Sequence, residues 1–179
     1  MHFTSRINFT TMLSNAVQDK LNAQIAKEAF ASNAYLAMAT WAENLGLPNI
    51  GEYFYLASDD ERTHMLQLYK YLNANGGKAV MPDQLGEPQR EFGTVLEAFK
   101  KVFDLEHTVT LAINELATWC LQNGEHATYL FLQPFVLEQQ DSERKVSEVI
   151  TIVERMGYEE RNLYYLDKTF KKINQGAGE

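Results

Sequence analysis

The sequence predicts an all-α protein: a four-helix bundle with one long crossover connection, followed by a short fifth helix. Apolar residues recur about every 3.6 positions through four long segments, as they do along one face of an amphipathic helix. The 179 residues include only 10 glycines and 4 prolines, fewer than the frequent turns of a strand-rich fold would require. The connections are short, long and short in order, which is the pattern of a bundle with one crossover.

The first two helices are predicted over residues 14–44 and 49–75. The first begins at Ser14, a residue type favoured at helix N-caps, and ends where Gly-Leu-Pro at 46–48 interrupts the apolar period. The second ends at the Asn-Gly-Gly sequence at 75–77. Because the link between them is short, we expect the two helices to be antiparallel neighbours.

The third and fourth helices are predicted over 94–122 and from the Asn-Gly break at 123–124 to about residue 156. Thr94, with a glutamate three residues later, forms a capping box at the start of the third helix. The connection over 76–93 holds two of the four prolines and is long enough to run the length of the bundle. A short fifth helix is predicted over 159–174.

The chain is predicted to form one domain over residues 14–174, with a disordered arm over 1–13 and a flexible tail over 175–179. No apolar run reaches the roughly 20 residues of a membrane-spanning helix, so we expect no membrane association. The first eleven residues contain Ser, Thr and one Arg but no acid. A remnant of an organellar targeting segment is therefore the alternative to a simple arm.

Charge and cysteine content limit the partners and the compartment. A net charge of −8 argues against binding to nucleic acid, whose phosphates it would repel, and suits a protein that handles cations. Cys120 is the single cysteine and cannot form a disulfide within the chain. We therefore expect a reducing compartment, the cytoplasm.

Each long helix places a polar side chain in the middle of its apolar face. In the second helix, Glu61 and His64 fall on the same face as Phe54 and Leu68 by the three- and four-residue spacing of a helix. The equivalent polar side chains are Glu28 on the first helix, Glu106 on the third and Gln139 on the fourth.

Three carboxylates in one core predict a bound cation. A buried carboxylate without a partner costs several kcal/mol, and neighbouring carboxylates repel one another. No lysine or arginine shares these faces. A divalent cation would offset the cost, and oxygen ligands with one imidazole suit iron, manganese or zinc. The alternative is that one or more faces is misassigned and the acids lie in solvent.

The order and spacing of these residues resemble the ferritin family over about residues 12–174. The resemblance rests on Glu28 with Tyr35 seven residues later, the Glu-Arg-Thr-His sequence at 61–64, Glu106, and the Glu-Gln pair at 138–139. It implies a ferritin-like bundle that assembles as a homo-oligomer, a hollow shell of 24 subunits. Such a shell oxidises Fe(II) with O2 or peroxide at a di-iron centre and stores a ferric mineral.

The resemblance also implies which side chains bind iron. The first iron would be bound by Glu28, Glu61 and His64, and the second by Glu61 as a bridge, Glu106 and Gln139. Tyr35 matches the tyrosine beside the centre, and both a redox role and simple packing are open for it.

Several departures refine this expectation. Bacterioferritins have a second Glu-x-x-His on the fourth helix, where this chain reads Gln-Gln-Asp-Ser over 139–142. They have a haem-binding methionine where Arg62 stands, so we expect no haem. Ser142 replaces a glutamate that bacterial non-haem ferritins usually share with a third iron site. The other positions of that candidate third site are Asp60, Glu138 and Asp141, for which a solvated inner face is the alternative.

Two other functions remain open from the sequence alone. One is a non-catalytic helical bundle that binds metal. The other is a different di-iron carboxylate oxidase, acting on an organic substrate. The fifth helix and the lack of any insertion that would form a substrate pocket count against the second.

Overall fold

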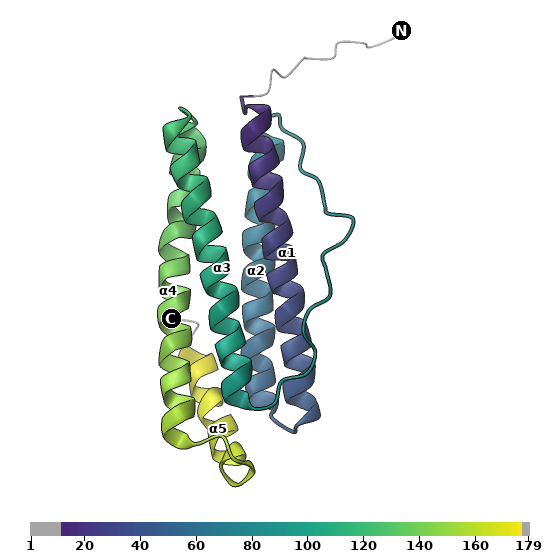
Figure 1. Cartoon of the computed structure of the whole chain (residues 1–179), viewed down its shortest axis with the longest axis vertical. Helices are drawn as coiled ribbons and strands as arrows, with labels where there is room; N and C mark the ends of the chain where they lie inside the picture. Colours follow the sequence, from purple (N-terminus) through teal and green to yellow (C-terminus); the bar gives the residue numbers. More distant parts are fainter. Residues whose placement is uncertain (1–11, 177–179) are drawn as a thin grey trace.

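The computed structural model describes residues 12–176, in which five α-helices and no strands are present. The helices are α1 (Asn15–Asn44), α2 (Pro48–Ala74), α3 (Val95–Gln122), α4 (His126–Met156) and α5 (Glu160–Gly176). Figure 1 shows four long helices in a bundle, with the short α5 at one end. The predicted all-α bundle with a fifth helix is confirmed.

The long connection between α2 and α3 determines the topology. It runs along the outside of α1 for the length of the bundle, so α2 and α3 begin at the same end (Figure 1). Its course is held by α1: Val80 N donates to Asn22 Oδ1 at 2.8 Å, and Asn22 Nδ2 donates to Lys78 O at 3.0 Å. The predicted crossover is therefore present and is tied to the bundle by hydrogen bonds.

Two of the helices begin at the predicted caps. The hydroxyl of Ser14 accepts a hydrogen bond from Val17 N at 3.3 Å, and that of Thr94 accepts one from Glu97 N at 3.1 Å. Both caps satisfy backbone donors that lack a partner in the first turn of a helix.

The N-terminus of α2 is capped instead by a side chain of α5. One carboxylate oxygen of Asp167 accepts hydrogen bonds from Asn49 N at 2.9 Å and Ile50 N at 3.0 Å, and the other accepts one from Asn49 Nδ2 at 2.6 Å. Asn174 Nδ2 donates to Asn49 O at 2.8 Å. A negative charge at a helix N-terminus is favourable, so this contact fixes α5 against α2.

Both ends of the predicted domain need adjustment. The predicted arm covers residues 1–13, of which 1–11 lie outside the described residues. Leu13 is buried in the core, and Met12 N donates to Asn75 O at 3.2 Å, so the bundle extends at least to residue 12. At the other end α5 continues to Gly176, two residues beyond the predicted limit, and 177–179 lie outside the described residues.

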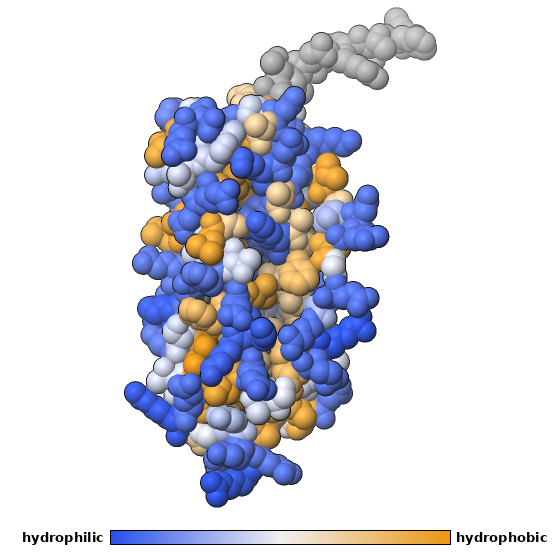
Figure 2. Space-filling model, viewed as in Figure 1, coloured by the Kyte–Doolittle hydropathy of each residue, from blue (hydrophilic) through white to orange (hydrophobic). Residues whose placement is uncertain are grey.

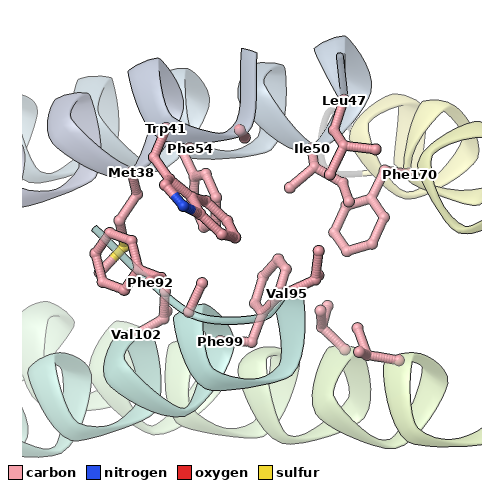
Figure 3. Packing of buried hydrophobic residues seen from close by; sticks show 14 of the residues in the cluster. Met38, Trp41, Leu47, Ile50, Phe54, Phe92, Val95, Phe99, Val102 and Phe170 are labelled. Atoms are coloured by element: carbon pink, nitrogen blue, oxygen red, sulfur yellow. The ribbon is translucent and has the colours of Figure 1, made fainter. Parts of the chain in front are cut away.

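The buried apolar side chains form two separate clusters, one in each half of the bundle. The cluster nearer α5 includes Phe54, Phe99 and Phe170, and the ring centroids of Phe54 and Phe99 lie 5.2 Å apart (Figure 3). The other cluster includes Leu21, Leu68, Ile113 and Leu132. Burial of each large apolar side chain contributes about 1.5–3 kcal/mol. The gap between the clusters falls at the middle of all four long helices.

The face drawn in Figure 2 is mainly polar. Figure 2 shows that most side chains on one face are hydrophilic and that the apolar ones form separate patches. Between Met12 and Gly176, no helix combines the length and the apolar character needed to cross a membrane.

Candidate metal centre

A layer of buried polar side chains lies between the two apolar clusters, with a contribution from each long helix. The exposed fractions are 1% for Glu28, 4% for Glu61, 4% for Glu106 and 3% for Gln139. His64, on the same face of α2 as Glu61, has a side chain that is 14% exposed. This burial excludes the alternative in which the helical faces are misassigned and the acids lie in solvent.

Three of the predicted ligands already form a cluster. Glu28, Glu61 and His64 each offer one ligand atom, and these atoms lie within 4.8 Å of one another. In the chain from residue 12 to 176 this is the one group of three or more such side chains. A cation bound at about 2.1 Å from each atom requires separations of up to about 4.2 Å. Small side-chain rotations would therefore close the group around an ion.

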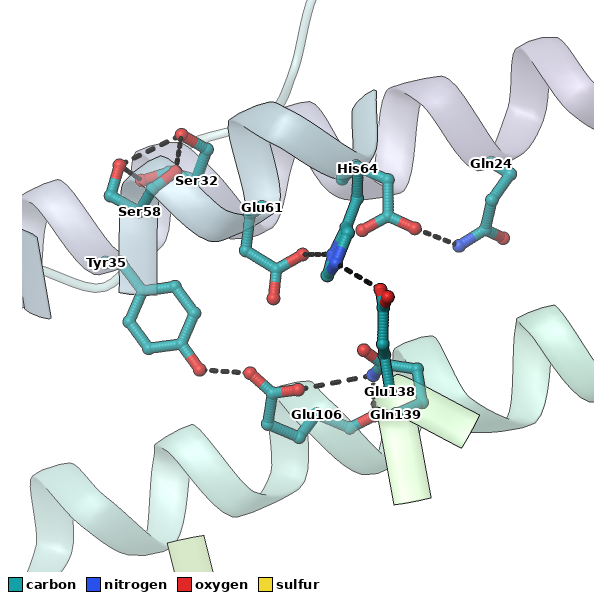
Figure 4. Close-up of polar contacts among 10 residues, drawn as sticks. Gln24, Ser32, Tyr35, Ser58, Glu61, His64, Glu106, Glu138 and Gln139 are labelled. Atoms are coloured by element: carbon teal, nitrogen blue, oxygen red, sulfur yellow. Dashed lines mark hydrogen bonds and ion pairs between the residues drawn. The ribbon is translucent and has the colours of Figure 1, made fainter. Parts of the chain in front are cut away.

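Glu106 is oriented by side chains of two other helices. The Tyr35 hydroxyl, on α1, donates a hydrogen bond to Glu106 Oε1. Gln139 Nε2, on α4, donates to Glu106 Oε2 at 3.2 Å (Figure 4). Gln139 therefore presents its amide nitrogen to Glu106. Binding of a cation through the amide oxygen, as predicted from the sequence, requires rotation of this amide.

The structure adds one buried polar residue that the sequence pattern did not single out. Gln24, which is 2% exposed, donates from Nε2 to Glu28 Oε1 at 2.7 Å. It lies one helical turn before Glu28 on the same buried face, and this spacing is the signal that could have identified it. The hydrogen bond occupies one oxygen of Glu28 and leaves the other free.

Burial makes the carboxyl groups weaker acids. Burial raises the pKa of Glu28 well above 4.5, and the neighbouring Glu61 raises it further. Burial and the charge of Glu106 raise the pKa of Glu61 to about 8. Burial also raises the pKa of Glu106, against the hydrogen bonds from Tyr35 and Gln139. The metal-free centre therefore holds protons near neutral pH, and bound cations would displace them.

Two buried acceptors in this layer lack partners. Among the described residues, no amide, hydroxyl or amine donor reaches Glu28 Oε2 or Glu61 Oε2, so only a proton carried by the carboxyl groups themselves can join them. Nδ1 of His64 lies 3.5 Å from Glu61 Oε2. A buried acceptor without a donor is unfavourable, and a divalent cation between these atoms would satisfy all of them. The donor set therefore fits a cation such as Fe(II).

The hydroxyl of Tyr35 is a fixed donor in this layer. Burial, followed by the charges of Glu106 and Glu61, raises the pKa of Tyr35 well above 10. The phenol therefore keeps its proton and donates it to the hydrogen bond with Glu106. Its geometric role is to hold this carboxylate in place.

A cleft of about 550 Å³ connects the centre with the surface between α2 and α4. Its inner wall includes Glu61, His64 and Glu106. Its outer wall includes Asp60, Glu138, Asp141, Ser142 and Lys145. The cleft provides a route by which small ions could reach the buried layer.

The acids of the candidate third site line this cleft but form other contacts. Asp141 pairs with Arg144 at 2.6 Å and with Lys145 at 2.9 Å, and hydrogen bonds from these two residues hold the pKa of Asp141 below its usual value. Glu138 Oε2 lies 3.1 Å from His64 Nε2. Iron binding by these carboxylates together with Asp60 would compete with these contacts, and the third site remains a prediction.

Comparison with known proteins identifies the family. Residues 18–156 match the ferritin family profile, described as a ferritin-like domain. The bacterial non-heme ferritin of Campylobacter jejuni is 30% identical over 162 residues, which cover 90% of this chain and 96% of that protein. The protein of the same name from Staphylococcus epidermidis is 31% identical over 157 residues, covering 88% and 94%.

Solved structures show the same relationship. The open-pore ferritin of the archaeon Archaeoglobus fulgidus superposes with a TM-score of 0.84 and 29% identity, covering 88% of this chain and 97% of that chain. The matched region, residues 18–156, includes the buried polar residues of all four long helices: Glu28, Glu61, Glu106 and Gln139. The chain therefore belongs to the ferritin family, as a non-haem member.

Proposed function

We propose that this protein stores iron and that each subunit is a ferroxidase, which oxidises Fe(II) to Fe(III) at a di-iron centre. Membership of the ferritin family supports iron storage. The observation that supports catalysis is the buried layer of three carboxylates and one imidazole, in which two carboxylate oxygens lack donors. A purely structural core would gain nothing from such a layer.

Two Fe(II) ions would bind as substrates on either side of Glu61. The first would be held by Glu28, Glu61 and His64, whose ligand atoms are already clustered. The second would lie between Glu61 and Glu106, whose charges interact. Glu61 is therefore the side chain placed to bridge the two ions, at the spacing of about 3.5–4 Å that is usual for two-metal sites.

The reaction would remove one electron from each Fe(II). O2 would accept both electrons and two protons and leave as hydrogen peroxide; with peroxide as the oxidant, the same electrons would yield water. The carboxylates would stabilise the product, because Fe(III) is the harder cation and prefers oxygen ligands. Tyr35 would keep Glu106 oriented throughout.

We also propose that the subunit assembles into a shell of 24 copies. Large apolar side chains remain exposed on α1, on the crossover and on α5, namely Leu36, Leu45, Val80, Met81, Tyr164 and Tyr165. A closed symmetric assembly needs such self-complementary patches. The cytoplasmic location remains a prediction.

The test is Fe(II) oxidation in air, followed by near-ultraviolet absorbance and size-exclusion chromatography. We expect a rapid iron-dependent rise in absorbance, with iron eluting in a particle far larger than the 20.5 kDa subunit. Glu61→Ala should slow the initial rate by about 100-fold or more, since it removes the bridging ligand. Glu115→Ala, which removes an exposed carboxylate of α3, is the matched control.

Three results would contradict the proposal. If Glu61→Ala oxidised iron at the original rate, the di-iron assignment would fail. Tight metal binding without oxidation, in a particle of subunit size, would favour the non-catalytic bundle. The cleft beside the centre could admit a small organic molecule. Iron-dependent consumption of O2 only when an organic substrate is added would therefore favour the other di-iron oxidase.

A further inference from the structure

We infer that Glu138 of α4 positions the imidazole of His64 for metal binding by fixing the ring tautomer that leaves Nδ1 free. The inference rests on the metal centre proposed above and adds a residue to it. Glu138 would not bind the first iron itself. Its role would be to orient a ligand supplied by another helix.

The two ring nitrogens of His64 face different carboxylates. Nδ1 lies 3.5 Å from Glu61 Oε2, on the side of the ligand cluster. Nε2 lies 3.1 Å from Glu138 Oε2, on the side of the cleft (Figure 4). An ionised carboxylate can only accept, so the contact places the proton on Nε2. A neutral imidazole has one N–H, and its lone pair is then on Nδ1, which faces the site of the cation.

A second side chain of α4 restrains the same ring. Phe135 packs on His64 with ring centroids 5.7 Å apart and an angle of 58° between the planes. Phe135 and Glu138 are three residues apart on α4 and therefore lie on one face of that helix. Phe135 limits the tilt of the imidazole ring, and Glu138 holds its Nε2 edge. Metal-binding histidines commonly have such a carboxylate on the second nitrogen, which fixes both tautomer and orientation.

The surrounding charges leave Glu138 available for this role. The cations that follow it on α4, Arg144 and Lys145, pair with Asp141. The Glu138 side chain is about half exposed, whereas the His64 side chain is 14% exposed. The contact with His64 uses one oxygen of Glu138, Oε2.

The test uses Zn²⁺ as the probe in the assembled, metal-free protein, with affinity measured by calorimetry. Glu138→Leu removes the acceptor and should weaken the tightest Zn²⁺ site by about 10- to 100-fold. Glu138→Gln removes the charge but keeps an amide oxygen that accepts from Nε2, and affinity should stay within about 3-fold of the original.

The chain supplies a matched control on the same helix. Glu143 contacts His107 Nδ1 at 3.1 Å, which is the same type of carboxylate–imidazole contact away from the centre. Glu143→Leu should change the Zn²⁺ affinity by less than about 2-fold. Zn²⁺-loaded crystals provide the second measurement. They should show Nδ1 of His64 bound to zinc in the original protein, and a rotated ring or Nε2 ligation in Glu138→Leu.

The possible outcomes separate this inference from the proposed centre. If Glu138→Leu retained full affinity and the original ring orientation, the positioning role would be wrong. If Glu138→Gln or Glu143→Leu lost as much affinity as Glu138→Leu, the effect would be one of charge, and the inference would also be wrong. Zn²⁺ binding that survived Glu61→Ala unchanged would instead contradict the metal centre itself.

Discussion

Replacing Glu61 with glutamine should stabilise the metal-free protein at alkaline pH. Glu61 is 4% exposed, and burial together with the charge of Glu106 raises its pKa from 4.5 to about 8. In the folded protein the carboxyl group therefore keeps its proton until about pH 8. In the unfolded chain, where the group is hydrated, it loses the proton near pH 4.5.

The sign and size of the effect follow from this difference. Between pH 4.5 and about 8 the folded state holds a proton that the unfolded state has lost, so the free energy of unfolding falls as the pH rises. The stabilisation is complete below pH 4.5 and is lost as the pH passes 8. At about 1.4 kcal/mol per pH unit, this difference in pKa corresponds to several kcal/mol of stability. Glutamine has no titratable proton, so Glu61→Gln removes the part of the pH dependence of the free energy of unfolding that Glu61 contributes.

The assay is thermal unfolding from pH 5 to 9 in the presence of a chelator. We expect the midpoint of the original protein to fall across this range and that of Glu61→Gln to fall much less, with a residual slope from Glu28 and Glu106, whose pKa values are also raised. Glu115→Gln, an exposed position on α3, is the control and should keep the original slope. Equal slopes for Glu61→Gln and the original protein would show that Glu61 does not carry a buried proton.

Three other substitutions test separate parts of the structure. Asp167→Ala removes the cap of α2 and should lower the free energy of unfolding, measured in denaturant, by about 2–3 kcal/mol. An unchanged denaturation midpoint would show that α5 docks on α2 without the Asp167 carboxylate. Tyr35→Phe removes the hydrogen bond to Glu106 and should slow Fe(II) oxidation several-fold while the first metal ion still binds; an unchanged rate would refute the orienting role. Ser142→Glu adds a carboxylate to the cleft and should tighten the second iron site and slow onward transfer of iron; unchanged iron titrations would contradict this.

The sequence was sufficient to predict that the main polar side chains of the centre face the interior. Each long helix runs for seven or more turns, so apolar residues at helical spacing recur on both sides of these positions. The apolar period alone therefore places Glu28, Glu61, Glu106 and Gln139 in the core, where all four are buried. Their location between two apolar clusters follows from antiparallel helices that place their midpoints at one level.

The remaining features depend on which residues of different helices lie close together. The apolar period along a single helix carries no information about this. The orientation of the Gln139 amide is set by Glu106, 33 residues earlier in the chain. The cap of α2 comes from Asp167, 118 residues after Asn49. The contact between His64 and Glu138 likewise forms only when α2 and α4 pack together. The sequence singled out His64, Glu106, Glu138 and Gln139 by their polar character and spacing, but it did not pair them, and it gave no signal for Asp167.

The most direct test of the di-iron centre is anomalous diffraction from crystals soaked with Fe(II) without oxygen. The proposed centre predicts two peaks in the buried layer, about 3.5–4 Å apart on either side of the Glu61 carboxylate. The peak beside Glu28 and His64 should have the higher occupancy, because that side already has three ligand atoms within 4.8 Å of one another. Iron bound only at surface acids, or a layer without any peak next to Glu61, would contradict the central claim.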